Sequence, residues 1–373
     1  MKLYHFMIDV KKYIMIKMKK VLFVFNHPAP YKVRLLNELS KFLDLEVIFE
    51  RGDASDRNKK FYFEQDYHFK LVPIKGIKIG TENLLSNGVK KHLKKNAYDL
   101  VIMNGYSQFP EMGAIKYLKK NKIPYCLYIN GGIIHKESSF KKNLKTKYIS
   151  GATFYMSPDE NSDKYLVYYG ADKTKIKRYT YSTTYKSEVL DKPLSKEEVA
   201  SLRKKLDINA EHVFISCGQL IKRKNYVDLV KAWPNDKNKM LIIAGDGKQK
   251  EEIQKIIDDE KKDNVRLIGF LQRDNVFTYY RASDAFLFPS HEDIYGHVIN
   301  EAMTQGLPIC SFPNVNSAKK LIKDGYNGYI VNSIEEMIAS LDKLEKCDKK
   351  NSLKTAKENT IEIMVEEHKK ILS

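Results

Sequence analysis

Two carboxylates in the last third of the chain, Asp293 and Glu301, are eight positions apart and lie on either side of a glycine. An apolar run precedes Asp293, and an amphipathic stretch predicts that a helix begins just after Gly296. The unpaired amides of Gly296, His297 and Val298 would point outward at that helix start, where the helix dipole favours negative charge. Glycine would leave room for close approach of a ligand. The pattern predicts a nucleotide diphosphate site, in which Asp293 accepts hydrogen bonds from sugar hydroxyls and Glu301 from the two hydroxyls of a ribose.

The same carboxylates also have a purely structural interpretation. An acidic side chain near a helix start stabilises the helix by roughly 0.3–1 kcal/mol through the dipole, without any ligand. Lys224, in a basic run with Lys222 and Arg223, could equally be a solvated charge. The motifs around these residues favour a binding site.

Five short motifs follow one another in order between Val213 and Asn332. They are GQLIKRKN at 218–225, GDG at 245–247, GFL at 269–271, the Asp293 and Glu301 pair, and DGYNG at 324–328. Their order and spacing resemble those of retaining GT-B glycosyltransferases, glycosyltransferase family 4 in particular. In that resemblance, Asp293 and Glu301 match the E-x7-E motif with Asp in the first place, and the first segment matches a G-R-L-x-x-x-K-G/N stretch that binds donor phosphates.

The resemblance implies an α/β protein with the GT-B fold, in which two Rossmann-like, doubly wound domains face a central cleft. The donor would bind the second domain, and the expected donor-binding residues are Gly218, Gln219, Arg223, Lys224, Gly245, Gly269, Phe270, Asp293, Gly296, His297, Val298 and Glu301. Lys224 and the helix amides would stabilise the leaving diphosphate as the glycosidic bond breaks. The family also implies retention, a UDP- or GDP-linked donor as substrate, and no cofactor or metal.

Two positions depart from the family pattern. Gln219 stands where the family usually has an arginine, so one phosphate-neutralising charge is missing unless Lys222, Arg223 or a residue of the other domain replaces it. Lys320 stands where a glutamate often precedes the Leu-Ile-x-x-Gly stretch. These departures predict an altered donor preference or, alternatively, lost activity.

Two shorter segments of the amino-terminal half also resemble the family. Residues 26–34, NHPAPYKVR, resemble a P-x-PYR opening, and residues 128–132, YINGG, resemble a DGG loop after a strand. Asn130 matches by position a loop residue that is a histidine in many relatives, so it joins Lys224 and Asp293 as a candidate catalytic residue. The acceptor-side candidates are His27, Tyr31 and His135. Histidines at such positions more often have surface or packing roles.

Apolar runs alternate with amphipathic stretches, which is the pattern of parallel sheets covered by helices. Strands are predicted at 21–25, 46–50, 100–103, 124–129, 152–156, 213–217, 240–244, 265–268, 285–288 and 308–311. Helices are predicted near 32–42, 111–120, 226–233, 248–258, 274–282 and 298–305. The polar and aromatic segment 52–69 predicts a long loop or an edge hairpin.

A polar stretch at 181–195 separates the two halves. The predicted organisation is an extension at 1–20, an acceptor-binding domain at 21–186 and a donor-binding domain at 187–373, whose last helix could pack back on the first domain. Ligands of open α/β sheets bind beyond the carboxyl ends of the strands, so two facing sheets would share one site.

The 373 residues include 65 Lys and Arg against 47 Asp and Glu, a formal net charge of +18, which predicts an anionic partner. Between Ser86 and Lys147 there are 13 Lys and 3 acidic residues, in runs that interleave with apolar residues. These runs could be solvated helix faces, or they could attract the domain to anionic lipid head groups. No nucleic-acid-binding motif is found, so nucleic acid is not an expected partner.

The four cysteines lie far apart, without a CxxC pair, as expected for reduced thiols in a cytoplasmic protein. Charged residues interrupt the apolar stretch at 1–20, and no uninterrupted apolar run is long enough to predict a transmembrane helix. The expected location is the cytoplasm, with peripheral contact at the inner face of the membrane.

The resulting prediction is a glycosyltransferase that moves a hexosyl or N-acetylhexosaminyl group from a nucleoside-diphosphate-sugar to a hydroxyl of a glycan or polyprenyl-linked acceptor. The pathway would be cell-surface polysaccharide biosynthesis, such as capsule or exopolysaccharide. One alternative is another GT-B sugar-nucleotide enzyme, an epimerase or phosphorylase, against which the series from GFL to Glu301 argues. The other is a non-catalytic nucleotide-sugar-binding protein, which Gln219 keeps open.

Overall fold

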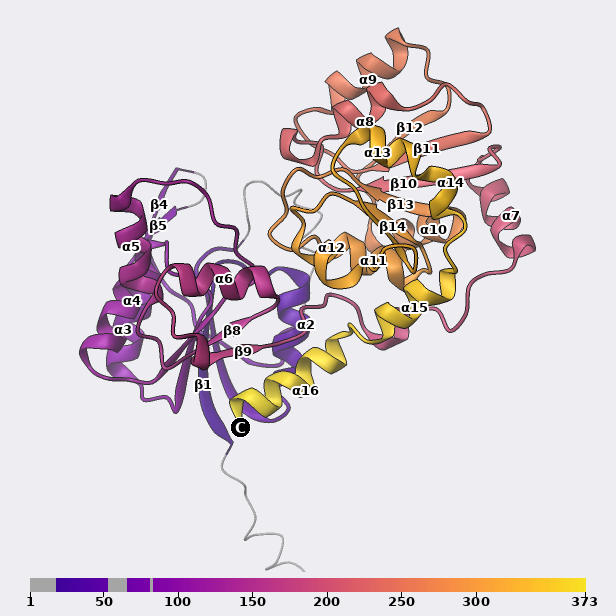
Figure 1. Cartoon of the computed structure of the whole chain (residues 1–373). Helices are drawn as coiled ribbons and strands as arrows, with labels where there is room; N and C mark the ends of the chain where they lie inside the picture. Colours follow the sequence, from indigo (N-terminus) through magenta and orange to yellow (C-terminus); the bar gives the residue numbers. More distant parts are fainter. Residues whose placement is uncertain (1–17, 53–65, 81–82) are drawn as a thin grey trace, which may run out of the picture.

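The computed structural model describes residues 18–52, 66–80 and 83–373. Two parallel α/β sheets follow each other along the chain, and Figure 1 shows them as two layered bodies, indigo to magenta and red to yellow. Most of the predicted extension 1–20 and of the predicted loop or hairpin at 52–69 lies outside the described residues.

The first sheet has seven strands in the order β3-β2-β1-β6-β7-β8-β9, all parallel. The strands are β1 (Lys19–Phe25), β2 (Leu43–Phe49), β3 (Lys70–Leu71), β6 (Leu100–Met103), β7 (Tyr125–Tyr128), β8 (Phe154–Ser157) and β9 (Ile176–Arg178). Its helices are α2 (Pro30–Leu39), α3 (Gly88–Lys95), α4 (Phe109–Lys120), α5 (Ser139–Ile149) and α6 (Glu160–Tyr168), and β4 (Ile77–Ile79) forms a hairpin with β5 (Asn83–Leu85). The central strands are buried on both faces because helices cover the sheet on each side.

The second sheet has six parallel strands in the order β12-β11-β10-β13-β14-β15. They are β10 (His212–Cys217), β11 (Lys239–Ala244), β12 (Val265–Gly269), β13 (Ala285–Phe288), β14 (Ile309–Ser311) and β15 (Gly328–Ile330). The helices are α7 (Lys196–Lys205), α8 (Tyr226–Ala232), α9 (Lys250–Asp259), α10 (Arg273–Ala282), α11 (His297–Thr304), α12 (Asn316–Leu321), α13 (Ile334–Ala339), α14 (Leu341–Leu344), α15 (Lys349–Lys357) and α16 (Ile361–Leu372). Short 3-10 turns at Lys186–Glu188 and Lys222–Lys224 carry residues of the candidate site.

The predicted fold class is confirmed, and each of the ten predicted strands corresponds to an observed one. The prediction missed β3, β9 and β15, which are edge strands of two or three residues, and also the three-residue strands β4 and β5 of the hairpin. Segments this short carry no periodicity that distinguishes them from loops. It also gave no bounds for α3, for α12 to α16, or for α5 and α6, and in the last two the buried positions are few and interrupted by lysines or polar residues.

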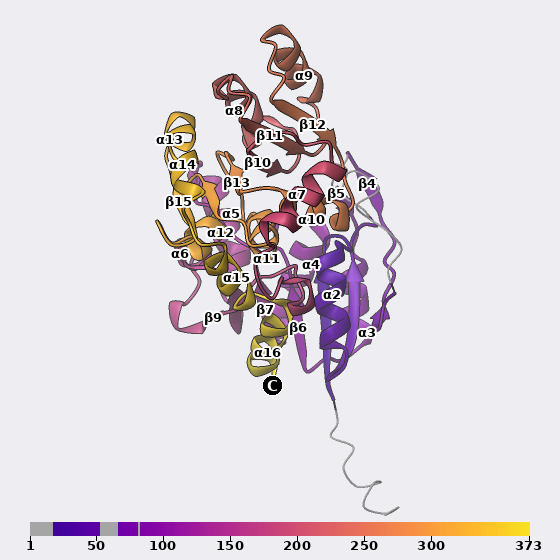
Figure 2. The same cartoon turned by 90° about the vertical axis from the view of Figure 1, so that its right-hand side faces the viewer.

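The chain crosses between the two halves twice, and the crossings are joined to each other. The backbone N–H of Ile361, at the start of α16, donates to the carbonyl of Thr184 at 2.8 Å. Beyond it, α16 lies against α2 and adds Ile361, Met364, Val365 and Leu372 to the core of the first half (Figures 1 and 2). None of the described helices is long and apolar enough to cross a membrane.

One histidine is fully buried where α16 meets the first sheet. The ring of His368 lies 4.9 Å from the Tyr179 ring and 5.7 Å from the Tyr128 ring, and its Nδ1 lies 2.7 Å from the carbonyl oxygen of Met364. Burial disfavours the charged imidazolium and lowers the pKa of His368 to about 4. The folded chain therefore holds this ring neutral, whereas the unfolded chain protonates it below about pH 6.5.

We expect acid to weaken the docking of α16 through this ring. The stability contributed by neutral His368 is complete above about pH 6.5 and is lost as the pH falls toward 4, by about 2 kcal/mol between pH 7 and pH 5. Urea unfolding at these two pH values checks this in His368→Gln, whose loss should be smaller by that amount. The exposed His68→Gln serves as the control; equal losses in both variants would contradict the expectation.

Candidate functional site

Lys224 and Asp293 meet at the carboxyl ends of two adjacent strands, β10 and β13. The two strands pair in parallel, so the loops that follow them leave the same edge of the sheet. After β10 the chain turns through the 3-10 turn that ends at Lys224, and after β13 a polar loop carries Asp293 to the start of α11. Residues 69 positions apart are thereby brought into contact.

Lys224 and Asp293 form a largely buried ion pair. Lys224 is 6% exposed, and its ammonium also lies 4.4 Å from the centre of the Phe288 ring. Arg223 Nη1 lies 3.8 Å from Asp293 Oδ2 and donates to the carbonyl of Glu292 at 3.2 Å. Burial raises the pKa of Asp293, but the charge and hydrogen bond of Lys224 outweigh burial and hold that pKa below its usual value. Asp293 is therefore an ionised carboxylate, suited to accept hydrogen bonds from hydroxyls.

Backbone bonds fix the loop that carries Asp293 from both sides. The carbonyl of Arg223 accepts from the amide of His291 at 2.9 Å, which joins this loop to the turn after β10. The amide of Asp293 donates to the carbonyl of Asn314 at 3.0 Å, and the carbonyl of Asp293 accepts from the amide of Asn316 at 3.4 Å. Three strand-end loops thus hold one another in place.

The glycines of these loops are required by the protein's own packing. A Cβ at Gly245 would lie 1.8 Å from the carbonyl oxygen of Gly218, so the loops after β10 and β11 could not meet. Gly296 has a φ of +89°, and a Cβ there would lie 2.8 Å from Val315 Cγ1. The prediction gave clearance for a ligand as the reason for Gly296; packing and backbone conformation already demand this glycine.

Helix α11 begins at His297, just after Gly296 as the pattern predicted and one residue before the approximate range 298–305, and Gly296 is its N-cap. Glu301 lies in its second turn, and its side chain is 18% exposed. Glu301 Oε1 accepts from Arg273 Nη1 at 2.5 Å and from Thr183 Oγ1 at 3.1 Å. The predicted ribose-binding carboxylate thus lies in the helix that follows the loop carrying Asp293, and the positive charge of Arg273 compensates its charge.

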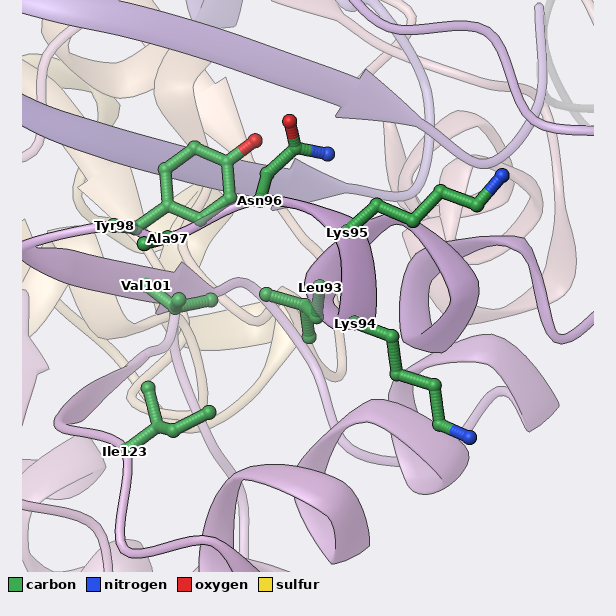
Figure 3. Close-up of a pocket in the computed structure, with 8 residues that line it drawn as sticks. All are labelled: Leu93, Lys94, Lys95, Asn96, Ala97, Tyr98, Val101 and Ile123. Atoms are coloured by element: carbon green, nitrogen blue, oxygen red, sulfur yellow. The ribbon is translucent and has the colours of Figure 1, made fainter.

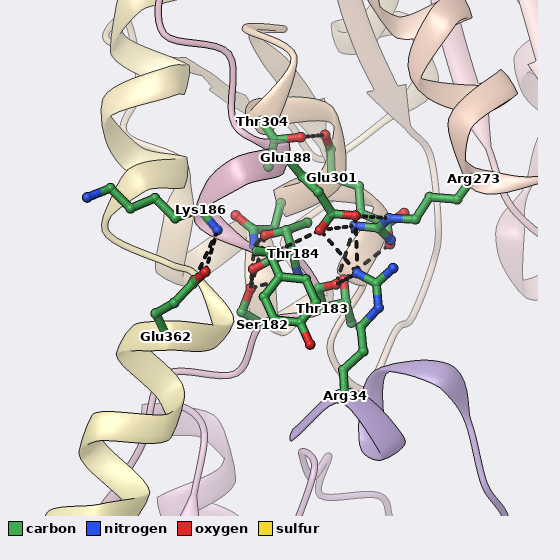
Figure 4. A network of polar contacts seen from close by, with 12 residues as sticks. Arg34, Ser182, Thr183, Thr184, Lys186, Glu188, Arg273, Glu301, Thr304 and Glu362 are labelled. Carbon is green, nitrogen blue, oxygen red and sulfur yellow. Dashed lines mark hydrogen bonds and ion pairs between the residues drawn. The ribbon is translucent and has the colours of Figure 1, made fainter. Parts of the chain in front are cut away.

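Figure 4 shows the wider network around Glu301. Glu188 lies between two arginines from the two halves of the chain: Arg34 Nη1 reaches it at 3.1 Å and Arg273 Nε at 3.0 Å. Burial raises the pKa of Glu188, but these two positive charges lower it further than burial raises it. The prediction missed Thr183, Glu188 and Arg273, because contacts spanning 28 to 154 positions leave no local pattern. Among the residues that bind Glu188 or Glu301 in this network, only Arg34 lies in a motif that the sequence analysis singled out.

The amino-terminal candidates lie beside the loop 289–296, the predicted donor loop, which carries Asp293. Asn130 follows β7, and its Oδ1 accepts from Asn104 Nδ2 at 3.3 Å. The next residue, Gly131, lies so close to the donor loop that a Cβ there would be 2.3 Å from the carbonyl oxygen of Ile294. His135 Nε2 is 3.5 Å from Glu292 Oε2 on the same loop.

The other two acceptor-side candidates differ in their surroundings. The Tyr31 ring lies 5.1 Å from the ring of His297, so these residues of different halves are in contact. The His297 ring is also 4.3 Å from the Tyr181 ring, which makes it part of an aromatic cluster. His27 is buried at the carboxyl end of β1.

The remaining predicted donor residues lie at the end of β12, in the loop after β10 and at the start of α11. Gly269 ends the edge strand β12, and its carbonyl accepts from the amide of Gly245 at 2.8 Å, with Phe270 directly after it. Gln219 follows Gly218 in the loop after β10, and Val298 packs on the core of the second half. Lys320 is the second residue that departs from the family pattern. Its Nζ donates to the carbonyl of Pro158 of the other half at 3.0 Å, and burial lowers the pKa of Lys320.

Two pockets lie outside the pair of Lys224 and Asp293. One, of about 430 Å³, is lined by Leu93, Lys94, Lys95, Asn96, Ala97, Tyr98, Val101 and Ile123 (Figure 3). It lies where β6 and β7 begin, which is the opposite sheet edge from the one that binds ligands in this architecture. The other, of about 540 Å³, lies between the halves and includes Asn161, Asn316 and Lys320.

One group of three residues among those described has ligand atoms within 4.8 Å of one another, as a metal would require: His212, Asp284 and Glu345. Asp284 Oδ2, however, already accepts from Arg203 Nη2 and from the amide of Val213, both at 2.7 Å. Arg203 would repel a second cation. The group also lies where β10 and β13 begin, away from Lys224 and Asp293.

Two parallel α/β sheets joined by two crossings, with a charged site where their strands end, define the GT-B fold. The structure of Anabaena Alr3699/HepE in complex with UDP and glucose superimposes with a TM-score of 0.70 at 16% identity, over 95% of this chain and 99% of that one. WaaG, described as a glycosyltransferase involved in lipopolysaccharide biosynthesis, gives a TM-score of 0.68 at 16% identity with the same coverage.

Residues 198–362, within the carboxyl-terminal half of the chain, match the family described as glycosyl transferases group 1. Alpha-monoglucosyldiacylglycerol synthase of Acholeplasma laidlawii is 34% identical over 152 residues, which are 39% of this chain and 38% of that protein. The lipopolysaccharide core biosynthesis glycosyltransferase LpsE of Rhizobium meliloti is 30% identical over 135 residues, 36% of this chain and 39% of that protein. The chain thus spans about two fifths of the length of these relatives.

The buried pair predicts a measurable loss of stability when its carboxylate is neutralised. Asp293→Asn removes the negative charge beside buried Lys224, and we expect the free energy of unfolding to fall by about 3 kcal/mol. The exposed pair of Glu160 and Lys164 provides a control, since solvent already screens these charges and Glu160→Gln should change the free energy of unfolding far less. Urea unfolding at pH 7 measures both changes; equally small losses would mean that solvent screens the pair.

Proposed function

We propose that this chain is a retaining glycosyltransferase that moves a sugar from a nucleoside-diphosphate donor to a hydroxyl of a glycan or lipid-linked acceptor in cell-surface polysaccharide biosynthesis. The observation that carries the proposal is the pair of Lys224 and Asp293 at adjacent strand ends, on the loop that leads to Glu301. The family match of residues 198–362 and the UDP in the HepE structure support a nucleotide-sugar donor, with UDP as the first nucleotide to test.

In this proposal, catalysis is mainly electrostatic. Lys224, Arg223 and the amides at the start of α11 provide positive charge for the diphosphate as its bond to the sugar breaks. Asp293 accepts hydrogen bonds from hydroxyls of the transferred sugar. Lys224 then interacts both with Asp293 and with the phosphates. Asn130, beside Gly131 and hence beside the donor loop, is the amino-terminal group proposed to act on the same sugar.

The second candidate function is nucleotide-sugar binding without transfer. The glutamine at position 219 favours it, because the missing arginine would have neutralised a phosphate. Release of free sugar or transfer to an added acceptor would separate an enzyme from a binding protein.

The first test is thermal stability against UDP-, GDP-, ADP- and TDP-sugars. A donor at a hundredfold excess over its Kd should stabilise the native protein by about 2.7 kcal/mol, which is visible as a raised melting temperature. Glu301→Gln should lose most of this shift, whereas Glu366→Gln, on the exposed face of α16, should keep it. A Glu301→Gln variant with full donor binding and full transfer activity would contradict the assignment of the donor site.

The acceptor side of the proposal includes contact with an anionic membrane surface, and the two basic helices differ in what accompanies their lysines. In α3 the apolar Val89 and Leu93 are buried. In α5, Phe140 and Leu144 are 77% and 40% exposed and lie one helical turn apart, on the same face. Exposed apolar side chains among lysines suit insertion between lipid head groups, so α5 is the proposed membrane-contacting element.

Vesicle sedimentation tests this element. We expect binding to phosphatidylglycerol-containing vesicles, falling steeply with salt, and little binding to pure phosphatidylcholine. Phe140→Ser with Leu144→Ser should reduce binding at least about tenfold, since each apolar side chain contributes roughly 1.5–3 kcal/mol when buried. The control variant combines Lys248→Glu, just before α9, with Lys255→Glu on α9 of the other half. It changes the net charge, which the serine variant does not, yet it should reduce vesicle binding less. A larger loss of vesicle binding in the Lys248→Glu, Lys255→Glu variant than in the Phe140→Ser, Leu144→Ser variant would place the lipid contact elsewhere.

A further inference from the structure

One arginine of α10 holds the carboxylate that is proposed to bind the donor ribose. Arg273 Nη1 donates to Glu301 Oε1 at 2.5 Å, while Arg273 Nε donates to Glu188 Oε1 at 3.0 Å (Figure 4). We propose that Arg273 is a positioning residue for the donor: anchored by Glu188, it orients Glu301 toward the ribose hydroxyls. This inference rests on the proposed function, because that function assigns the donor ribose to Glu301. Arg273 itself lies outside the motifs of the proposed donor site.

The two oxygens of Glu301 differ in a way that fits this role. Oε1 accepts both hydrogen bonds, from Arg273 and from Thr183 at 3.1 Å. Within the described ranges no hydrogen bond to Oε2 is found, and the side chain keeps 18% of its surface exposed. One oxygen is therefore held by the protein and the other remains available to a hydroxyl donor.

The guanidinium is itself fixed from its far edge. Its planar fork has fixed donor directions, so the bond from Nε to Glu188 determines where Nη1 points. Burial lowers the pKa of Arg273, but the charges of Glu301 and Glu188 outweigh it and raise that pKa, which keeps the group a cation. Arg273 thus provides Glu301 with both a direction and a compensating charge.

The anchor of Arg273 belongs to the connection between the two halves. Glu188 ends the 3-10 turn of the linker and also accepts from Arg34 Nη1 of α2 at 3.1 Å. The carbonyl of Thr183 accepts from both arginines at 3.3 Å. The orientation of Glu301 therefore depends on a network to which both halves contribute.

The test compares two nucleotides with and without the ribose hydroxyls. Calorimetric titration of wild-type protein and of Arg273→Gln with UDP and with 2′,3′-dideoxy-UDP (or the same pair for the base that the donor panel selects) isolates the interaction. We expect Arg273→Gln to weaken UDP binding about tenfold and dideoxy-UDP binding by less than about twofold. Arg281→Gln is the matched control, because Arg281 lies on the same helix and bonds to Gln305 at 2.6 Å, away from Glu301.

The possible results are distinguishable. Equal losses for the two nucleotides, or a loss as large in Arg281→Gln, would show that Arg273 only maintains the structure and would overturn the inference. Tighter UDP binding by Arg273→Gln would also overturn it, since Arg273 would then be blocking Glu301. If wild-type protein binds neither nucleotide, the proposed function fails and this inference fails with it; normal wild-type binding with an unchanged Arg273→Gln defeats the inference alone.

Discussion

The candidate site depends on an ion pair buried at the point where two parallel strands end. Pairing of β10 with β13 places the loops after them side by side, and the charges of Lys224 and Asp293 compensate each other there. Without such compensation, either charge alone would make the loop it lies on costly to bury. The backbone bonds among the loops after β10, β13 and β14 then hold the loops that carry the pair in place.

Helix α11 transmits this constraint to the rest of the molecule. Its first residue lies at the proposed phosphate position, and Glu301 lies at the proposed ribose position. Between them, the fully buried Asn300 Nδ2 donates to Ser182 Oγ, Thr184 Oγ1 and the carbonyl of Asn359 at 2.9–3.2 Å. One short helix therefore carries Glu301 and other proposed donor residues and also binds both crossings between the halves, so a change of interdomain angle would act on the proposed site through this helix.

The sequence predicted what local patterns encode. Apolar runs located ten of the thirteen strands of the two sheets, and motif spacing singled out Lys224, Asp293 and Glu301 as members of one site. Contacts between distant segments could not be predicted from local patterns. Arg273 and Glu188, for example, are 85 positions apart, and neither lies in a motif. Gly296 shows a third case, since its type was noticed while the packing that requires it depends on Val315, which lies on another loop.

The two departures from the family pattern acquire different meanings in the structure. Lys320, in place of an acidic residue, reaches a carbonyl of the other half, so its cation now contributes to an interdomain contact. Gln219 removes a cation from the loop after β10, and Lys224 is already paired with Asp293. Arg223, whose side chain is less buried than that of Lys224, lies 3.8 Å from the same carboxylate and is the second cation beside Asp293. A donor that engages Asp293 through its sugar hydroxyls would release part of the charge of both basic residues, which links recognition of the sugar to neutralisation of the diphosphate.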